Sequence, residues 1–189
     1  MSQRRRFLKY SVISLFGFGV LSSFVPFVKS WNIRKGRIRE FDVEVDLSRL
    51  KEGELIRTEW MGKPIHIHRR TAEDLKLLDK PSPDLRDPDS EESTQPMSAK
   101  NRYRSINPNI FVSVPLCTHL GCEAAPRFDA GAVDLGGDEW PGGYFCPCHG
   151  SKFDAAGRVF RGLPAPVNME VPPHDYRDGK LIIGLGHEA

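Results

Sequence analysis

The sequence predicts a mainly β body carried on one N-terminal transmembrane helix. Three observations lead to this prediction: an uncharged apolar run near the N-terminus, an alternation of apolar and polar residues that begins at Phe41, and a dispersed supply of 17 glycines and 15 prolines. Dispersed Gly and Pro favour turn-rich β structure over a helix bundle. With 189 residues, 39% of them hydrophobic and 28% charged, the chain is long enough for one globular domain with appendages.

The apolar run covers residues 10–28, nineteen positions without a charged side chain. A helix of roughly 20 apolar residues spans the hydrocarbon core of a bilayer, so we predict a transmembrane anchor over 10–28 behind a cytoplasmic segment, residues 1–9. A cleaved signal peptide is the alternative. Two features oppose it, because the run exceeds an ordinary signal-peptide core and residues 26–30 lack an A-x-A-like cleavage site.

The cytoplasmic segment contains Arg-Arg-Arg-Phe-Leu-Lys at residues 4–9, which resembles the twin-arginine export motif, with Gln3 in place of the usual Ser or Thr. A generic positive flank is the alternative interpretation. Basic residues after the apolar run outnumber those before it, so loop charge alone does not set the orientation. The export motif instead predicts a single-pass protein of the bacterial inner membrane, with its N-terminus inside and its body in the periplasm.

The charge of the chain is unevenly distributed. Residues 1–40 carry nine Lys/Arg and one acid, a formal charge of +8, which leaves −6 on the rest of the chain. A basic end on an acidic body argues against a nucleic-acid partner and for a chain held at a lipid bilayer. Because no pair of acids accompanies a nucleophile in a recognisable pattern, the sequence gives no support to a hydrolase.

The body begins with a strand-like alternation over residues 41–47, in which apolar residues occupy every second position. Residues 55–60 and 65–70 are two further runs joined by Met-Gly-Lys-Pro at 61–64, which predicts a hairpin. Thr71, followed by acids and leucines, predicts the start of a short helix.

Residues 79–98 hold four prolines and many acids and are expected to form a solvent-exposed excursion. Strand-like residues resume at 110–116, and an Arg-Asp-Gly-Lys turn at 177–180 leads into the final strand. His66 and His68 share one face of a strand. An H-x-H metal pair is one interpretation of them, but we expect solvated side chains on a polar face.

All four cysteines lie in two short segments, residues 117–122 (Cys-Thr-His-Leu-Gly-Cys) and 146–151 (Cys-Pro-Cys-His-Gly-Ser), each of which also holds one histidine. Two disulfides are one interpretation, with three possible connectivities. A structural zinc site is a second, although zinc sites usually use C-x-x-C pairs. The third is an iron–sulfur centre held by two cysteines and two histidines, which gives both histidines a role and leaves two cysteines over.

The double pattern C-x-H-x-G-C … C-x-C-H-G-S resembles that of the Rieske 2Fe–2S proteins. The resemblance implies that Cys117 and Cys146 bind one iron, while His119 and His149 bind the other. Two neutral imidazoles then replace two thiolate anions. The cluster carries less negative charge as a result, and its reduction potential lies at about −150 to +300 mV.

The resemblance also implies a disulfide between Cys122 and Cys148, which would join the two segments. It assigns to Ser151 a hydroxyl that hydrogen-bonds a bridging sulfide and raises the potential, and it places a proline loop at residues 162–166. One residue departs from the pattern. Phe153 stands where many members that oxidise ubiquinol have a tyrosine, so a hydrogen-bond donor to a ligand sulfur is missing.

Over essentially the whole chain, the sequence is similar to the iron–sulfur subunits of the quinol–cytochrome c oxidoreductase, the cytochrome bc complex. These subunits keep their export signal as a membrane anchor. The resemblance implies a flexible neck over residues 29–40 and a Rieske-type antiparallel β-sandwich head over 41–189. Within the head, a small cluster-binding subdomain is expected over about 111–166.

The activity implied by this resemblance is that of a ubiquinol–cytochrome c reductase and proton translocase. The subunit would accept one electron from ubiquinol, hydrogen-bonded to His119 or His149, and pass it to a c-type cytochrome, coupled to proton release and proton-gradient formation. Its expected partners are the cytochrome b and c-type cytochrome subunits of a dimeric complex. The alternative is a Rieske ferredoxin or oxygenase component, which the export motif, the anchor and the second pair of cysteines oppose.

Overall fold

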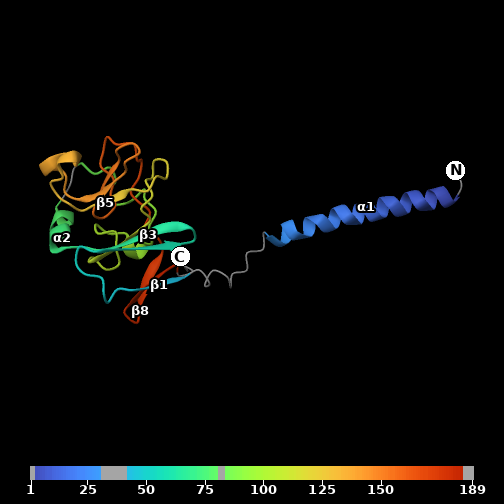
Figure 1. Cartoon of the computed structure of the whole chain (residues 1–189), viewed down its shortest axis with the longest axis horizontal. Helices are drawn as coiled ribbons and strands as arrows, with labels where there is room; N and C mark the ends of the chain where they lie inside the picture. Colours follow the sequence, from blue (N-terminus) through green and yellow to red (C-terminus); the bar gives the residue numbers. More distant parts are fainter. Residues whose placement is uncertain (1–2, 31–41, 81–83, 185–189) are drawn as a thin grey trace. The chain divides into compact units, whose positions relative to one another are not determined.

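The computed structural model describes residues 3–30, 42–80 and 84–184 (Figure 1). The chain divides into two units, one that contains the N-terminal helix and one that contains all the strands. The expected neck, residues 29–40, lies outside the described residues from residue 31 onward.

The first unit is the helix α1, Gln3–Ser30. It extends past both ends of the predicted anchor, residues 10–28. A 28-residue helix is about 42 Å long, more than the roughly 30 Å of a bilayer hydrocarbon core. Within the described residues, α1 is the helix long and apolar enough to cross a membrane, judged by length and composition.

The described residues of the second unit form three small antiparallel sheets of three strands each, which confirms the predicted mainly β body. The strands, in their order within each sheet, are β1 (Val43–Asp46), β9 (Lys180–Ile183) and β8 (His174–Arg177); β2 (Leu55–Trp60), β3 (Lys63–Arg69) and β4 (Ile110–Ser113); and β5 (Ala125–Arg127), β6 (Gly143–Phe145) and β7 (Lys152–Asp154). In sequence, the second cysteine-containing segment joins β6 to β7, and the first segment precedes β5, so this sheet positions both of them.

Both predicted hairpins are present, β2–β3 and β8–β9. The first hairpin turns through Met61 and Gly62, whose φ angles of 50° and 76° are those of the left-handed two-residue turn that matches strand twist. This turn is shorter than the four residues expected, because Trp60 already pairs with Lys63.

The predicted short helix is α2, Ala72–Asp79, and it begins as expected at Thr71. The Thr71 hydroxyl accepts a hydrogen bond from the Asp74 amide, and the Asp74 carboxylate accepts one from the Thr71 amide. This reciprocal capping box satisfies two amides that the first turn leaves without partners. Three 3₁₀ turns complete the helical elements of the described residues: Met97–Ala99, Val133–Leu135 and Gly137–Glu139.

Most described residues of the segment 79–98 are exposed, as predicted, but Leu85, Asp87 and Ser90 are buried. Leu85 is 1% exposed and forms a β-bridge with Phe160. Asp87, also buried, accepts hydrogen bonds from neighbouring backbone amides, and its carbonyl accepts one from the Asn168 side chain at 2.8 Å. These contacts fasten the segment to the part of the chain that follows β7. The acids that suggested solvent exposure thus include internal hydrogen-bond acceptors.

The core of the second unit positions the cysteines. Cys117 and Cys146 belong to a hydrophobic cluster that also includes Phe111, Tyr144 and Phe153. The other two sheets share a separate cluster, which includes Ile65, Ile67, Val112, Leu181 and Ile183. The first cysteine of each cysteine-containing segment is therefore buried in a packed interior, while other residues of the segments, such as Leu120 and His149, reach the surface.

Two buried arginines hold the loops around this interior. Arg104 donates to the Met169 carbonyl at 2.6 Å, and Arg70 donates to the Tyr103 carbonyl at 2.7 Å, each as one of several such bonds. Buried charges are tolerated when hydrogen bonds satisfy them. Here backbone carbonyls do so, and each arginine joins segments that are distant in sequence.

Candidate metal centre

The two cysteine-containing segments fold into turns with the same backbone pattern. In each, the amide of the first residue donates to the carbonyl of the sixth, and the amide of the fifth donates to the carbonyl of the first. These distances are 2.7 and 2.8 Å in residues 117–122, and 2.8 and 3.0 Å in residues 146–151. The fifth residue is glycine in both. The two turns are therefore structural equivalents that differ in which side chains they carry.

Cys117 and Cys146 occupy the first position of each turn. Both are buried, and neither takes part in a disulfide. Burial raises the pKa of the Cys117 thiol, a hydrogen bond with Cys146 also raises it, and hydrogen bonds from the His119 amide and the Ser151 hydroxyl oppose the shift. The two thiols are thus neighbours, with donors beside them that favour a thiolate.

His119 and His149 lie closer to the surface than the thiols. Their ring centroids are 4.9 Å apart, and the ring planes are nearly perpendicular at 83°. His149 is exposed and His119 half-buried. The structure therefore brings together the pair of thiols and, separately, the pair of imidazoles.

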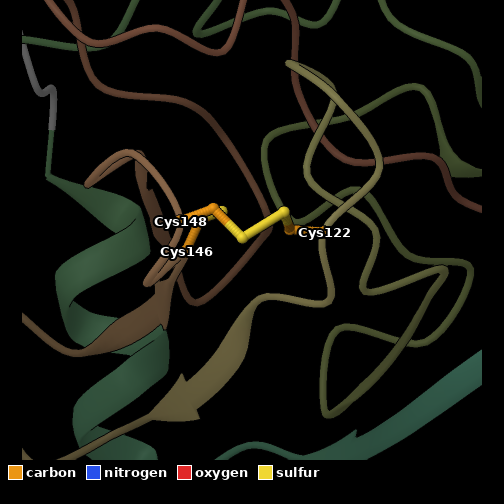
Figure 2. Close-up of side chains that lie close together, drawn as sticks. All are labelled: Cys122, Cys146 and Cys148. Atoms are coloured by element: carbon orange, nitrogen blue, oxygen red, sulfur yellow. A yellow bond between two sulfur atoms is a disulfide. The ribbon is translucent and has the colours of Figure 1, made fainter.

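Cys122 and Cys148 form the disulfide that the resemblance implied, at a sequence separation of 26 (Figure 2). The disulfide joins the two equivalent turns. Because Cys117 and Cys146 stay unpaired, the interpretation with two disulfides is wrong.

The arrangement of donors distinguishes a single ion from a two-iron cluster. The four expected ligands are not among the donor sets that gather within 4.8 Å in the described residues; the set that does is Cys122, Cys146 and Cys148, of which two are in the disulfide. A single zinc ion needs four ligands around one point, whereas a 2Fe–2S cluster needs one pair for each iron. A pair of free buried thiols and a separate pair of imidazoles fit the second requirement.

The proline loop, residues 162–166, is fastened to both turns. The Ser151 hydroxyl oxygen accepts a hydrogen bond from the Ala165 amide at 3.1 Å, and the Thr118 hydroxyl donates to the Val167 carbonyl at 2.6 Å. With its oxygen bonded to that amide, the Ser151 hydroxyl can direct its own proton toward the thiols. Sequence reasoning did not single out Thr118, and its hydroxyl between two expected ligands was the available signal.

His66 and His68 are not solvated, contrary to expectation. Their exposed fractions are 1% and 0%. Within the described residues, no ring nitrogen of either has a hydrogen-bond partner; the Nε2 atom of His66 lies 3.6 Å from a carboxylate oxygen of Glu123. His68 stacks on Phe128 with ring centroids 3.7 Å apart. The polar face assumed for β3 is covered by the segment that carries the third sheet.

These buried histidines predict an acid-sensitive fold. Burial lowers the pKa of His66 and of His68 from the ordinary 6.5 to about 4. Between these pH values the unfolded chain binds protons that the folded chain excludes, so stability falls as the pH falls through this window. The slope is roughly 1.4 kcal/mol per pH unit for each histidine. Urea unfolding at a series of pH values measures it, and the double variant His66→Gln/His68→Gln should flatten the dependence. An unchanged slope in that variant would contradict the assignment.

Comparisons with known proteins relate the chain to Rieske iron–sulfur proteins. Residues 90–173 match the family model of the Rieske [2Fe-2S] domain. The chain is 44% identical over 183 residues to a ubiquinol-cytochrome c reductase iron-sulfur subunit from Allochromatium vinosum, which covers 96% of this chain and 88% of that protein. It is 35% identical to the subunit of the same name from Rhodospirillum rubrum, with 96% and 91% covered.

A solved structure titled "Hyperthermophilic respiratory Complex III" aligns with 92% of this chain and 98% of its own, at 20% identity and a TM-score of 0.47, a similarity too low to add to the assignment. The sequence relatives establish the family, because they match 96% of this chain at 44% and 35% identity. The chain belongs to the family of Rieske iron–sulfur subunits of ubiquinol–cytochrome c reductase.

Proposed function

We propose that this chain carries single electrons from quinol to a c-type cytochrome as the iron–sulfur subunit of a membrane-bound cytochrome bc complex. The observation that carries the proposal is the placement of the side chains on the two turns. Each turn has one free thiol in the core and one imidazole nearer the solvent, and a disulfide joins the turns. The family relationship supplies the complex in which such a centre works.

The residues that would hold the Rieske 2Fe–2S cluster are Cys117 and Cys146 on one iron and His119 and His149 on the other. When bound, the cluster supplies a site that accepts and releases one electron at a time. The Ser151 hydroxyl, held by the Ala165 amide, would stabilise added negative charge by donating a hydrogen bond.

The imidazoles would make the contact with quinol. The ring nitrogen that does not bind iron is free to accept a hydrogen bond from a quinol hydroxyl, and it can take the proton as the electron leaves the quinol. His149 is the more exposed of the two rings and His119 the more covered. Proton and electron would thus leave the quinol at neighbouring positions, which avoids a charged intermediate in an apolar pocket.

The surface around the imidazoles would seal this contact against water. Leu120, which follows His119, is 71% exposed, and Pro164 of the proline loop is also exposed. Apolar side chains that gather in the exposed surface around a reactive group favour a docking role for that surface. We infer that this rim seats in the quinol pocket of cytochrome b.

The rest of the chain supports a membrane location. The helix α1 would anchor the subunit in the bacterial inner membrane, with residues 1–9 cytoplasmic, the twin-arginine segment directing export, and residues 41–189 in the periplasm. The neck expected over residues 29–40 would let the head move between cytochrome b and the c-type cytochrome. In the complex, which we expect to be dimeric, the head would visit these partners in turn.

The docking role of Leu120 tests the proposal. In membranes that contain the complex, Leu120→Asp should lower quinol-dependent cytochrome c reduction at least about tenfold, or roughly 1.4 kcal/mol of transition-state free energy. The matched control is Val133→Asp, which changes a side chain that is 91% exposed and should alter the rate less than about twofold. Reduction of the cluster by ascorbate should be normal in both. Equal rates for the two variants would contradict the proposed contact.

The residue at position 153 predicts a second measurable effect. Phe153 is fully buried in the hydrophobic core that also contains Cys117 and Cys146. A hydroxyl added by Phe153→Tyr would therefore lie within this core. A donor beside the sulfur ligands stabilises the reduced, more negative centre, so the midpoint potential should rise by about 30–70 mV. Redox titration of the purified full-length chain measures the shift. An unchanged or lower midpoint would show that position 153 has only a packing role.

A further inference from the structure

A cavity of about 220 Å³ lies at the ends of β6 and β7 that are opposite the turn of residues 146–151. It is partly open to solvent, and its walls come from α2, from the segment around Leu85 and from the residues just outside the β6–β7 pair. Its apolar lining consists of Leu77, Leu78, Leu85, Pro141, Ala155 and Phe160. None of the expected iron ligands is among its described lining residues, so the proposed electron transfer leaves this cavity without a role.

Arg158 is the buried cation of this cavity. Its side chain is 6% exposed, and its Nε donates to a carboxylate oxygen of Asp154 at 2.7 Å. That carboxylate also accepts hydrogen bonds from the Ala156 and Arg158 amides, so the fold satisfies its charge. Among the residues that the structure describes, no hydrogen bond engages the two Nη atoms of Arg158, and neither is one of the fully buried polar atoms without a partner. Because Arg158 lines the cavity, the outer edge of its guanidinium offers unused donors there.

We propose that this cavity binds a monocarboxylate that carries a compact apolar group, such as benzoate. The outer edge of a guanidinium presents two N–H donors that match the two oxygens of a carboxylate, and such paired bonds are among the strong hydrogen bonds of proteins. The apolar walls would bury the rest of the ligand. The volume of about 220 Å³ lies below the roughly 300 Å³ at which pockets for drug-sized ligands begin, so the bound group is small.

The charges around the cavity favour a ligand with one negative charge over a ligand with two. The Arg158 charge is shared with Asp154 inside, while Lys80, Asp84 and Glu139 are exposed lining residues. Water screens these three exposed charges, and the lysine offsets one of the two acids. A phosphate dianion would meet more repulsion and would need more donors than one guanidinium edge supplies. A neutral amide would have only one acceptor oxygen for the two Nη atoms.

Fluorine-labelled probes test this proposal on the full-length chain with its cluster, purified in a non-ionic detergent. The probe is para-fluorobenzoate, and its control is para-fluorobenzamide, which has nearly the same shape without the charge. Line broadening in fluorine NMR spectra measures the binding of each compound, with detergent alone as the blank. The benzoate should bind at least about tenfold more tightly than the benzamide, because only the benzoate engages both Nη atoms as a charged acceptor. Equal affinities, or no saturable binding of the benzoate, would overturn the proposal.

Two leucines of α2 provide a matched pair of variants that place the probe. Leu77 lines the cavity and Leu75 does not, and both side chains are partly buried. Leu77→Trp should fill the cavity and weaken binding of para-fluorobenzoate at least about fivefold. Leu75→Trp should change it less than about twofold. The visible absorbance of the cluster shows that both variants stay folded, and undiminished binding in Leu77→Trp or equal losses in the two variants would overturn the proposal.

Removal of the guanidinium tests the polar contact directly. Arg158→Gln should abolish the preference for para-fluorobenzoate over para-fluorobenzamide, and a preference that survives would overturn the proposal. This variant also breaks a buried ion pair, which is costly when one partner remains. If it does not fold, the comparison of the two leucine variants and of the two probes decides the matter.

Discussion

Replacing Cys146 with serine is expected to leave the purified chain without iron and without a Rieske paramagnetic signal. Cys146 is 1% exposed, is free of any disulfide, and begins a turn that two backbone hydrogen bonds close. A serine hydroxyl is a poor substitute for a thiolate toward iron, and its oxygen has a shorter bond to carbon than the sulfur has. Iron content, visible absorbance and paramagnetic resonance of the full-length chain measure the loss.

The control changes the other pair of cysteines. The double variant Cys122→Ser/Cys148→Ser removes the disulfide but none of the expected ligands, so it should retain iron. Closing a loop of this length is worth about 3–4 kcal/mol, so the cluster should be lost at a lower temperature or denaturant concentration than in the parent. A full Rieske signal in Cys146→Ser, or an iron-free double variant, would contradict the division of the cysteines into ligands and a disulfide.

Local sequence patterns predicted most of the elements correctly. The cap at Thr71, the hairpin after Trp60 and the alternation over residues 41–47 each depend on neighbours within a few residues, and each has its counterpart in the structure. The two cysteine-containing turns are equally local, because the hydrogen bonds that close each of them lie within six consecutive residues. The sequence pattern predicted the ligands on these segments, and not their backbone fold.

Features that depend on distant contacts were not predictable in this way. Alternation places His66 and His68 on one face of β3, but only the folded chain shows that Phe128 covers that face. Asp87 looked like a surface acid, although it is an internal acceptor for the segment around Asn168. Arg104 gave no signal in the sequence that it donates to carbonyls more than 50 residues away. In each case the partner, and therefore the burial, is set by tertiary structure.

Replacing Gly143 with alanine is expected to destabilise the chain by about 3 kcal/mol or more and to prevent stable cluster binding. Gly143 lies in β6 opposite Asp154 of β7, with a φ angle of 148°. A Cβ atom there would overlap the backbone of Phe153 and Asp154. Backbone atoms cannot turn aside as a flexible side chain can, so the β6–β7 pair would have to open. These strands flank the turn at residues 146–151, and opening them displaces both expected ligands on that turn, Cys146 and His149.

Gly62 provides a control that distinguishes the steric overlap at Gly143 from the ordinary cost of placing a side chain on a residue with positive φ. Gly62 has a φ angle of 76°, and an added Cβ would meet no atom within 4 Å, so Gly62→Ala should cost only about 1 kcal/mol. Urea unfolding measured by circular dichroism gives both values, and visible absorbance reports the cluster in the same samples. If Gly143→Ala were no more destabilising than Gly62→Ala, the close packing of β6 on β7 would not support the second turn. A large loss confined to Gly143→Ala, together with loss of absorbance, would show that strand pairing at this position holds Cys146 and His149 in place for iron.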